Sequence, residues 1–372
     1  MSKINRRFWF QLHGWFSLPI WVIFSFVCLT GTISVLSHEI TWLVNPDSRA
    51  NNPEHLIAKP INDLIKTVEQ KFPTSEVSWV MTREPYLSYV ISFTDTNKPA
   101  AQAYVNQYTG EIQEVFQGMT FIGFMRSLHG WLLFPWHHNF SVGYYLVSLM
   151  AIVMMGALVT GLVVYKKFWR AFFNPQLRVH KGLRIFLQDA HRFSGVWSMW
   201  FLFIISITGL WYLTQAVLWH NDVEIEPHAP LLDNKAVPTY QAKVPDFSID
   251  LDQALEVAEQ TYADFTPTFI MLPEHNRDTF KLVGKGDFIL YDDTSYKLSI
   301  NPWQGNIEAQ QDPDNMTVLQ TISHITDPIH YGTIGGIWTK IIWFVFGLIL
   351  SGMSVAGFMI WRYRLVESKD EK

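Results

Sequence analysis

Residues 12–32 read LHGWFSLPIWVIFSFVCLTGT, and residues 190–210 read AHRFSGVWSMWFLFIISITGL. Each stretch begins with a histidine, continues as a long apolar run, and reaches a Thr-Gly pair 17 residues after the histidine. A spacing kept in two distant parts of one chain indicates an internal repeat. The histidines are His13 and His191, and the threonines are Thr30 and Thr208.

Four segments of the chain are apolar over the ~20 residues needed to cross a bilayer, and long polar stretches follow the first and the third. The order span, polar stretch, span thus occurs twice. We predict a membrane protein, a four-transmembrane-helix bundle with two outer α+β domains, built as a tandem repeat. Its predicted parts are an N-terminal segment (1–12), membrane spans (13–37, 142–165, 191–215 and 331–361), outer domains (38–126 and 216–330), an outer interface segment (127–141), a basic loop (166–190) and a tail (362–372).

The distribution of basic residues predicts the orientation of these spans. Half of the 28 Lys and Arg residues lie in residues 1–12, residues 166–192 and the tail. Cytoplasmic segments of membrane proteins are enriched in Lys and Arg. Both termini and the basic loop are therefore predicted to be cytoplasmic, and the two outer domains to lie on the opposite side.

Each outer domain is predicted to be a helix followed by a small antiparallel sheet. The helices carry the related hexapeptides TVEQKF (67–72) and VAEQTY (257–262). Neither domain contains a nucleophile motif, a phosphate loop or a metal cluster of recognisable spacing, so both are interpreted as interaction or scaffold modules. Alternating apolar residues place the strands at 76–82, 86–93 and 101–107 in the first domain, and at 266–272, 278–284, 288–293 and 296–305 in the second.

Four histidines stand at the entrances of predicted spans, where ionisable side chains are by default functional candidates. His13 and His191 lie at the cytoplasmic side, and His129 and His330 at the outer side. Each pair has one member from each half of the repeat. Two imidazoles at matched depth on different helices suit axial ligation of a haem iron from opposite sides. The only cysteine, Cys28, excludes covalent CxxCH attachment and thiolate metal sites.

Other interpretations of these residues stay open at this point. The histidines are alternatively interfacial polar residues without a ligand. His38, His137 and His138 are rival ligands for the outer site. Asp189 and Arg192 form either an interfacial charge pair or a group that holds haem propionates. The remaining histidines are expected on solvated surfaces: His55, His180, His220, His228, His275 and His324.

Three motifs resemble the PepSY-associated transmembrane helix family: LHGW (12–15), DAHRFSGVW (189–197) and YVNQYTGEI (104–112). The resemblance covers nearly the whole chain. The sequence departs from the family pattern at Ala190, where a larger apolar residue is usual, and at NPWQG (301–305), which lacks the usual Asp before Pro.

The family includes inner-membrane iron-siderophore reductases of Gram-negative bacteria. The resemblance therefore implies a b-type reductase with two haem b groups, ligated by His13 with His191 and by His129 with His330. It would pass electrons across the bacterial inner membrane to a periplasmic ferric siderophore and release iron as Fe(II). Since no nicotinamide or flavin fingerprint appears, a quinol or a separate reductase is expected as donor. No nucleic-acid partner is expected. Two alternatives are a haem-free PepSY-type protein that regulates a protease, and an iron or siderophore permease.

Overall fold

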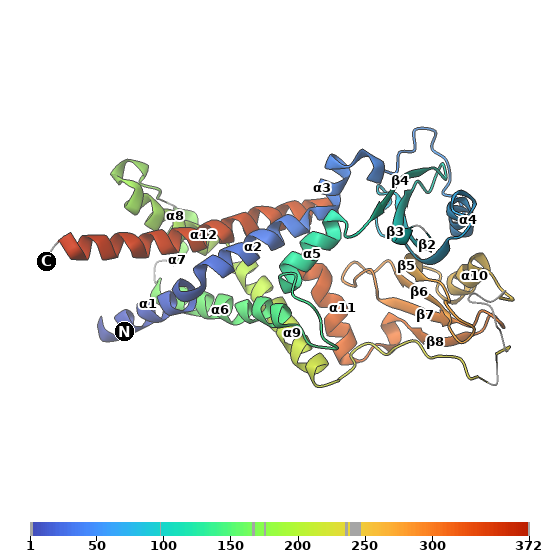
Figure 1. The fold of residues 1–372 in the computed structure, drawn as a ribbon. Helices are drawn as coiled ribbons and strands as arrows, with labels where there is room; N and C mark the ends of the chain where they lie inside the picture. The colour runs from blue at the N-terminus through green and yellow to red at the C-terminus, as the bar shows by residue number, and fades with distance from the viewer. Residues whose placement is uncertain are drawn as a thin grey trace. The chain divides into compact units, whose positions relative to one another are not determined.

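The computed structural model describes residues 3–96, 98–165, 168–174, 176–234, 237–238 and 247–370. Lys166 and Lys167 of the predicted basic loop, and residues 239–246 of the second predicted outer domain, lie outside the described residues. The chain divides into two compact units, each drawn from both halves of the repeat (Figure 1). The membrane unit comprises Met1–Ser37, Phe121–Glu224 and Thr326–Lys372, and the sheet unit comprises His38–Thr120 and Ile225–Ile325.

Within the described residues, four helical segments of the membrane unit are long and apolar enough to cross a bilayer: Arg7–Val35, Val142–Val164, Met199–His220 and Gly336–Val366. They correspond to the four predicted spans. The helices of this unit are α1 (Lys3–Ser17), α2 (Trp21–Val35), α5 (Phe121–Trp131), α6 (Val142–Val164), α7 (Phe168–Phe173), α8 (Leu183–Trp197), α9 (Met199–His220), the end of α11 (Val318–Tyr331) and α12 (Gly336–Asp370).

Two of the predicted spans, 13–37 and 191–215, contain a helix break that the hydropathy did not indicate. A 3₁₀ turn at Leu18–Ile20, which contains Pro19, separates α1 from α2. Proline has no backbone N–H to continue the helical ladder, which favours a break there. In the second half, Ser198 separates α8 from α9. The breaks place His13 on α1 and His191 on α8, each on a separate helix N-terminal to its break.

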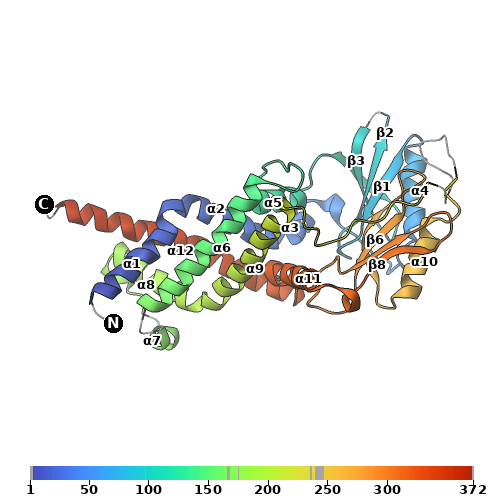
Figure 2. The same cartoon turned by 90° about the horizontal axis from the view of Figure 1, so that it is seen from below.

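The helices of the membrane unit pack as two equivalent sets. In one set α1 packs on α6, and in the other α8 packs on α12. The two sets are joined crosswise, because α2 lies along α12 and α6 lies along α9 (Figures 1 and 2). Since α1, α2 and α6 correspond in the repeat to α8, α9 and α12, the same contacts occur twice with the halves exchanged. The repeat thus gives equivalent helices of the two halves equivalent neighbours.

The sheet unit contains one antiparallel sheet of eight strands in the order β4-β3-β2-β1-β5-β6-β7-β8. The two predicted sheets are thus continuous: β1 of the first half pairs with β5 of the second through Val80 and Ile270. The strands are β1 (Glu76–Met81), β2 (Tyr89–Asp95), β3 (Lys98–Val105), β4 (Ile112–Gln117), β5 (Thr266–Met271), β6 (Phe280–Lys285), β7 (Tyr296–Ile300) and β8 (Ile307–Gln311), and the helices are α3 (Ser37–Val44), α4 (Ile61–Lys71), α10 (Leu251–Thr261) and the start of α11.

One hydrophobic core joins the two halves of this unit. Leu64 of α4 and Ala254 of α10 are fully buried against strand residues such as Ile91 and Leu282. Alternate strand residues point to the same face, so both helices cover apolar side chains of a single sheet. The helices α4 and α10 also contact one another. The core is therefore shared rather than divided between two modules.

The strand predictions were wrong in three places. Residues 288–293 form turns, not a strand, while β4 and β8 were missed. In 288–293 the apolar residues Phe288 and Ile289 are exposed instead of packing on the core. A short apolar run is compatible with either outcome. The strands β4 and β8 lie at the two edges of the sheet, where polar residues alternate with apolar ones and weaken the signal.

Candidate functional site

The predicted cytoplasmic-side histidines face each other inside the membrane unit. The ring centroids of His13 on α1 and His191 on α8 are 6.3 Å apart, with the ring planes at 81°. We call them the inner pair. They lie beside Gly161 and Gly357, towards the C-terminal ends of α6 and α12, and we call this end of the bundle the basic end.

The second predicted pair also meets, at the other end of the bundle. His129 on α5 and His330 on α11 have ring centroids 6.3 Å apart and ring planes at 26°. We call them the outer pair. The two pairs thus share one separation although they come from different helices. Along the second half of the chain, 17 residues separate His191 from the Thr208 that contacts His330. The break at Ser198 lies between them, so this path spans at most about 25 Å of helical rise.

Hydrogen bonds orient all four imidazoles in the same way. Nδ1 of His129 lies 3.1 Å from the carbonyl oxygen of Val27, and Nδ1 of His191 lies 3.1 Å from that of Met353. A carbonyl oxygen only accepts, so Nδ1 carries the hydrogen and donates it. Nε2 is then the basic nitrogen of each ring.

The other two rings use threonine hydroxyls. Nδ1 of His330 is 2.8 Å from Oγ1 of Thr208, whose own hydroxyl donates to the carbonyl of Ile204. Nδ1 of His13 is 3.0 Å from Oγ1 of Thr160 and 3.1 Å from the carbonyl oxygen of Ala157. The repeated threonine noticed in the sequence therefore serves the outer pair, since Thr30 also lies 3.5 Å from Nδ1 of His129.

Glycines make room for the rings. A Cβ on Gly31 would lie 2.6 Å from Cε1 of His129, a distance that real Cβ atoms essentially never show. Gly161 and Gly357, related by the repeat, approach Cε1 of His13 and His191 at an ordinary 3.5 Å. A single sequence does not reveal these contacts between glycines and imidazoles, because the residues lie far apart in the chain.

Almost the whole chain matches one family of membrane proteins. The model of the PepSY-associated TM region matches residues 10–364. The chain belongs to the PepSY-associated transmembrane family. No curated protein gives a significant match. All four histidines of the two pairs lie inside the matched region, so they are part of the family domain.

The other candidate outer ligands of this PepSY-associated protein lie elsewhere. His38 belongs to the sheet unit, where its Nδ1 lies 3.3 Å from Oε1 of Glu84. His137 and His138 are exposed in the segment between α5 and α6, where His137 pairs its backbone with Phe140. None of these three imidazoles belongs to the outer pair.

The prediction for His324 was wrong, because this side chain is buried in the sheet unit rather than solvated. It is only 2% exposed, with Nδ1 at 2.8 Å from Oδ1 of Asp292 and Nε2 at 3.2 Å from Oε1 of Glu226. Glu226 also pairs with Lys297. Burial by itself would lower the pKa of His324, but these two carboxylates outweigh burial and raise it to about 9. Nothing in the local sequence links these four residues, which lie on separate segments.

Asp189, next to the inner pair in sequence, has a structural partner. Its carboxylate accepts two 2.8 Å hydrogen bonds from the guanidinium of Arg178, while Arg192 stands 3.7 Å away. The bonds from Arg178 hold the pKa of Asp189 below its ordinary value. Asp189 is buried, whereas Arg178 and Arg192 are largely exposed. The charge-pair interpretation therefore accounts for Asp189, with Arg178 as the partner that the sequence did not identify.

A polar group surrounds His330. The hydroxyl of Tyr212 donates to Oδ1 of Asp327 at 2.8 Å, and the ring of Tyr212 stands 5.0 Å from that of His330 at 79°. Arg126 interacts electrostatically with Asp327. Arg126 and Asp327 precede their histidines by three residues each, so the repeat places opposite charges at equivalent positions. The sequence could have indicated this exchange through the shared spacing.

The geometry of each pair can be compared with what one metal atom requires. With bonds of about 2 Å to each imidazole nitrogen and about 1.2 Å from nitrogen to ring centroid, two axial imidazoles have centroids roughly 6.4 Å apart. Both pairs are separated by 6.3 Å. Among the described residues, no group of three or more His, Cys, Asp or Glu side chains is placed to hold a metal ion. Two protein donors fit a metal whose other ligands come from a macrocycle.

Proposed function

We propose that this membrane protein is a b-type dihaem reductase that passes electrons from the basic end of its bundle to a ferric siderophore at the outer end. The observation that supports it most is the repeated 6.3 Å separation between two imidazoles that both donate through Nδ1. Haem iron, when bound, supplies one-electron redox chemistry at each pair. The cytoplasmic location of the basic end and the inner bacterial membrane are parts of this proposal.

Some residues around each pair would bind the iron, and others would orient these ligands. The four imidazoles would bind iron through Nε2, and their Nδ1 acceptors fix the ring orientation and increase ligand basicity. Gly31 leaves space at the outer pair that a larger residue would fill. The path from His191 to Thr208 spans at most about 25 Å of helical rise, against a hydrocarbon core of about 30 Å. One pair near each membrane face would carry electrons most of the way across.

Reduction explains how such a protein would release iron. A ferric siderophore holds Fe(III) through hard oxygen donors, and it holds Fe(II) far less tightly. One electron per iron converts the first state to the second, and no bond is made or broken by a protein side chain. The substrate is thus the ferric chelate, and the donor is a quinol or a separate reductase.

Haem content decides this proposal. Purified protein from haem-replete cells is expected to show reducible Soret and α bands and two haems per chain. His13→Ala and His129→Ala should each lose one haem and keep the other, whereas the exposed His137→Ala should keep both. Colourless wild-type protein, or loss of both haems in either single variant, would contradict the assignment.

The substrate is tested separately. Reduced protein mixed without oxygen with a ferric hydroxamate chelate should reoxidise, and an Fe(II)-specific chromophore should appear in equal amount. Protein that binds two haems but transfers no electron to any ferric chelate would leave an electron carrier with another acceptor. A haem-free protein would favour the protease-regulating or permease alternatives.

A further inference from the structure

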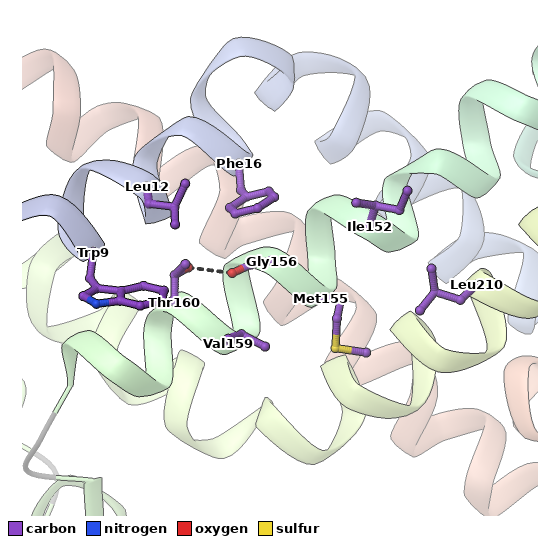
Figure 3. A pocket seen from close by; sticks show the side chains of 9 residues that line it. All are labelled: Trp9, Leu12, Phe16, Ile152, Met155, Gly156, Val159, Thr160 and Leu210. Carbon is purple, nitrogen blue, oxygen red and sulfur yellow. Dashed lines mark hydrogen bonds between the residues drawn. The ribbon is translucent and has the colours of Figure 1, made fainter.

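An apolar crevice opens on the side of the membrane unit next to the inner pair. Its volume is about 360 Å³, within the range of small-molecule sites. It is bounded by α1, α6 and the middle of α9 (Figure 3). Val159 and Ile152 of its wall are nearly half exposed within a membrane-spanning helix, so the crevice opens towards lipid. The lining residues are Trp9, Leu12, Phe16, Ile152, Met155, Gly156, Val159, Thr160 and Leu210.

One residue connects the crevice to the inner pair. Thr160 lines the crevice, and its Oγ1 lies 3.0 Å from Nδ1 of His13. Trp9 lies at the same end of the crevice as Thr160, and Leu210 and Ile152 lie at the other (Figure 3). The Trp9 end of the crevice is close to the basic end of the bundle. A molecule in the crevice is therefore one side chain away from an imidazole of the inner pair.

The lining suits a flat ring with an apolar tail. Phe16 lies so close to Gly156 that a Cβ there would be 2.4 Å from the phenyl ring, so the glycine admits the aromatic wall. The six-membered ring of Trp9 faces Thr160 and closes this end of the crevice (Figure 3). From residue 152 to residue 160, α6 extends about 12 Å. That length accommodates a ring at the Trp9 end and a tail along Ile152 and Leu210.

The aromatic lining of this crevice is not repeated in the second half of the chain. Positions equivalent to Trp9, Phe16 and Thr160 in the second half are Leu187, Ser194 and Ala356. The aromatic wall and the hydroxyl that reaches the inner imidazole are thus present on one side of the bundle only. An acyl chain would require neither feature.

We propose that an isoprenoid quinol binds in this crevice, with its ring between Trp9 and Phe16, and is the electron donor for a haem that the inner pair would hold. The proposal rests on the proposed function and identifies the donor. Oxidation breaks the two quinol O–H bonds and leaves a quinone, two electrons and two protons. Two ferric chelates are the oxidants, and the haems that the inner and outer pairs would hold would supply the one-electron steps between quinol and chelate. The protons pass to water at the basic end.

Photolabelling tests the binding site without depending on haem. The full-length protein in nanodiscs is irradiated with an azido-quinone, and the labelled peptides are identified by mass spectrometry. Label is expected on α1 and α6 around Phe16 and Val159. Val159→Trp, which fills the crevice, should reduce this label by about tenfold or more, the loss equivalent to about 1.4 kcal/mol of binding. The matched control is Val355→Trp, at the repeat-equivalent, similarly exposed position of α12, which should label like the wild type.

Rapid mixing tests the electron transfer. Decylubiquinol should reduce the wild type and Val355→Trp at similar rates and Val159→Trp about tenfold more slowly, while dithionite reduces all three alike. Equal effects of the two tryptophans, or displacement of the label by oleate as well as by quinone, would overturn the proposal and indicate a lipid groove. Crevice labelling in a protein without haem would support the quinone site and refute the reductase. A protein that binds two haems but shows no label in the crevice would refute the quinone site and support the dihaem proposal.

Discussion

Replacement of Gly31 by alanine is a sharp test of the outer pair. The new Cβ would lie 2.6 Å from Cε1 of His129, which is 0.8 Å short of the 3.4 Å at which ordinary contact begins. The same Cβ would be 3.0 Å from both ring nitrogens, so rotation of the ring gives no relief. The imidazole must move away from α2. Its hydrogen bond to the carbonyl oxygen of Val27, now 3.1 Å, would then be broken.

Two opposing contributions to the free energy of unfolding nearly cancel in Gly31→Ala, so haem affinity is the property expected to change. Alanine in place of glycine favours a helix by about 1 kcal/mol, and the lost hydrogen bond costs about the same. Stability should therefore change little. Loss of a partner that orients a metal ligand typically lowers metal affinity by about 10- to 100-fold, and displacement of the ligand itself adds to this. We expect Gly31→Ala to remain folded and to lose the outer haem.

The assay is haem per chain by pyridine haemochrome, together with thermal unfolding. Gly31→Ala should give one haem and an unfolding temperature near that of the wild type. The matched control is Gly161→Ala, whose Cβ would be 3.5 Å from Cε1 of His13 and which should keep two haems. The reasoning is refuted if Gly31→Ala keeps two haems with unchanged spectra, or if Gly161→Ala loses one.

Three further results are expected. Thr208→Val removes the Nδ1 acceptor of His330, and haem retention at the outer pair during dilution should fall about 10- to 100-fold, while Thr208→Ser retains it. The pKa of His324 is raised to about 9 from about 6.5. Its ion pairs therefore stabilise the sheet unit fully below about pH 6.5, and this stabilisation is lost as the pH rises through 9. The unfolding temperature of the wild type should fall between pH 6.5 and pH 9, whereas that of His324→Gln should not change over this interval. Asp250 caps α10 through a reciprocal hydrogen-bond pair with Gln253, and Asp250→Ala should lower the unfolding free energy in urea by about 1 kcal/mol, whereas no change would show that the cap adds nothing.

The membrane architecture could be predicted because its signals are local. The apolar runs identified all four spans, and the spacing from His13 to Thr30, repeated from His191 to Thr208, indicated the duplication. Matching residues across the duplication then paired the histidines that the structure brings together. Hydropathy averages over many residues, so it did not detect the helix breaks at Pro19 and Ser198.

Contacts between distant segments could not be predicted in the same way. The pairing of β1 with β5 depends on two strand edges meeting, and both strands alternate as any half-buried strand does. The close approach of Gly31 to His129 and the burial of His324 beside Asp292 each join residues that are far apart in the chain. A single sequence contains no pattern that links such residues.

The crosswise pairing of histidines has a consequence for how the protein could have been assembled. Each pair takes one imidazole from each half of the chain, so one half alone would contain two half-sites and no complete one. Two copies of such a half would need to associate as a symmetric dimer, in which both halves are constrained to be identical. Joining them in one chain removes that constraint. The two sides could then specialise, as Thr160 opposite Ala356 and Arg126 opposite Asp327 illustrate.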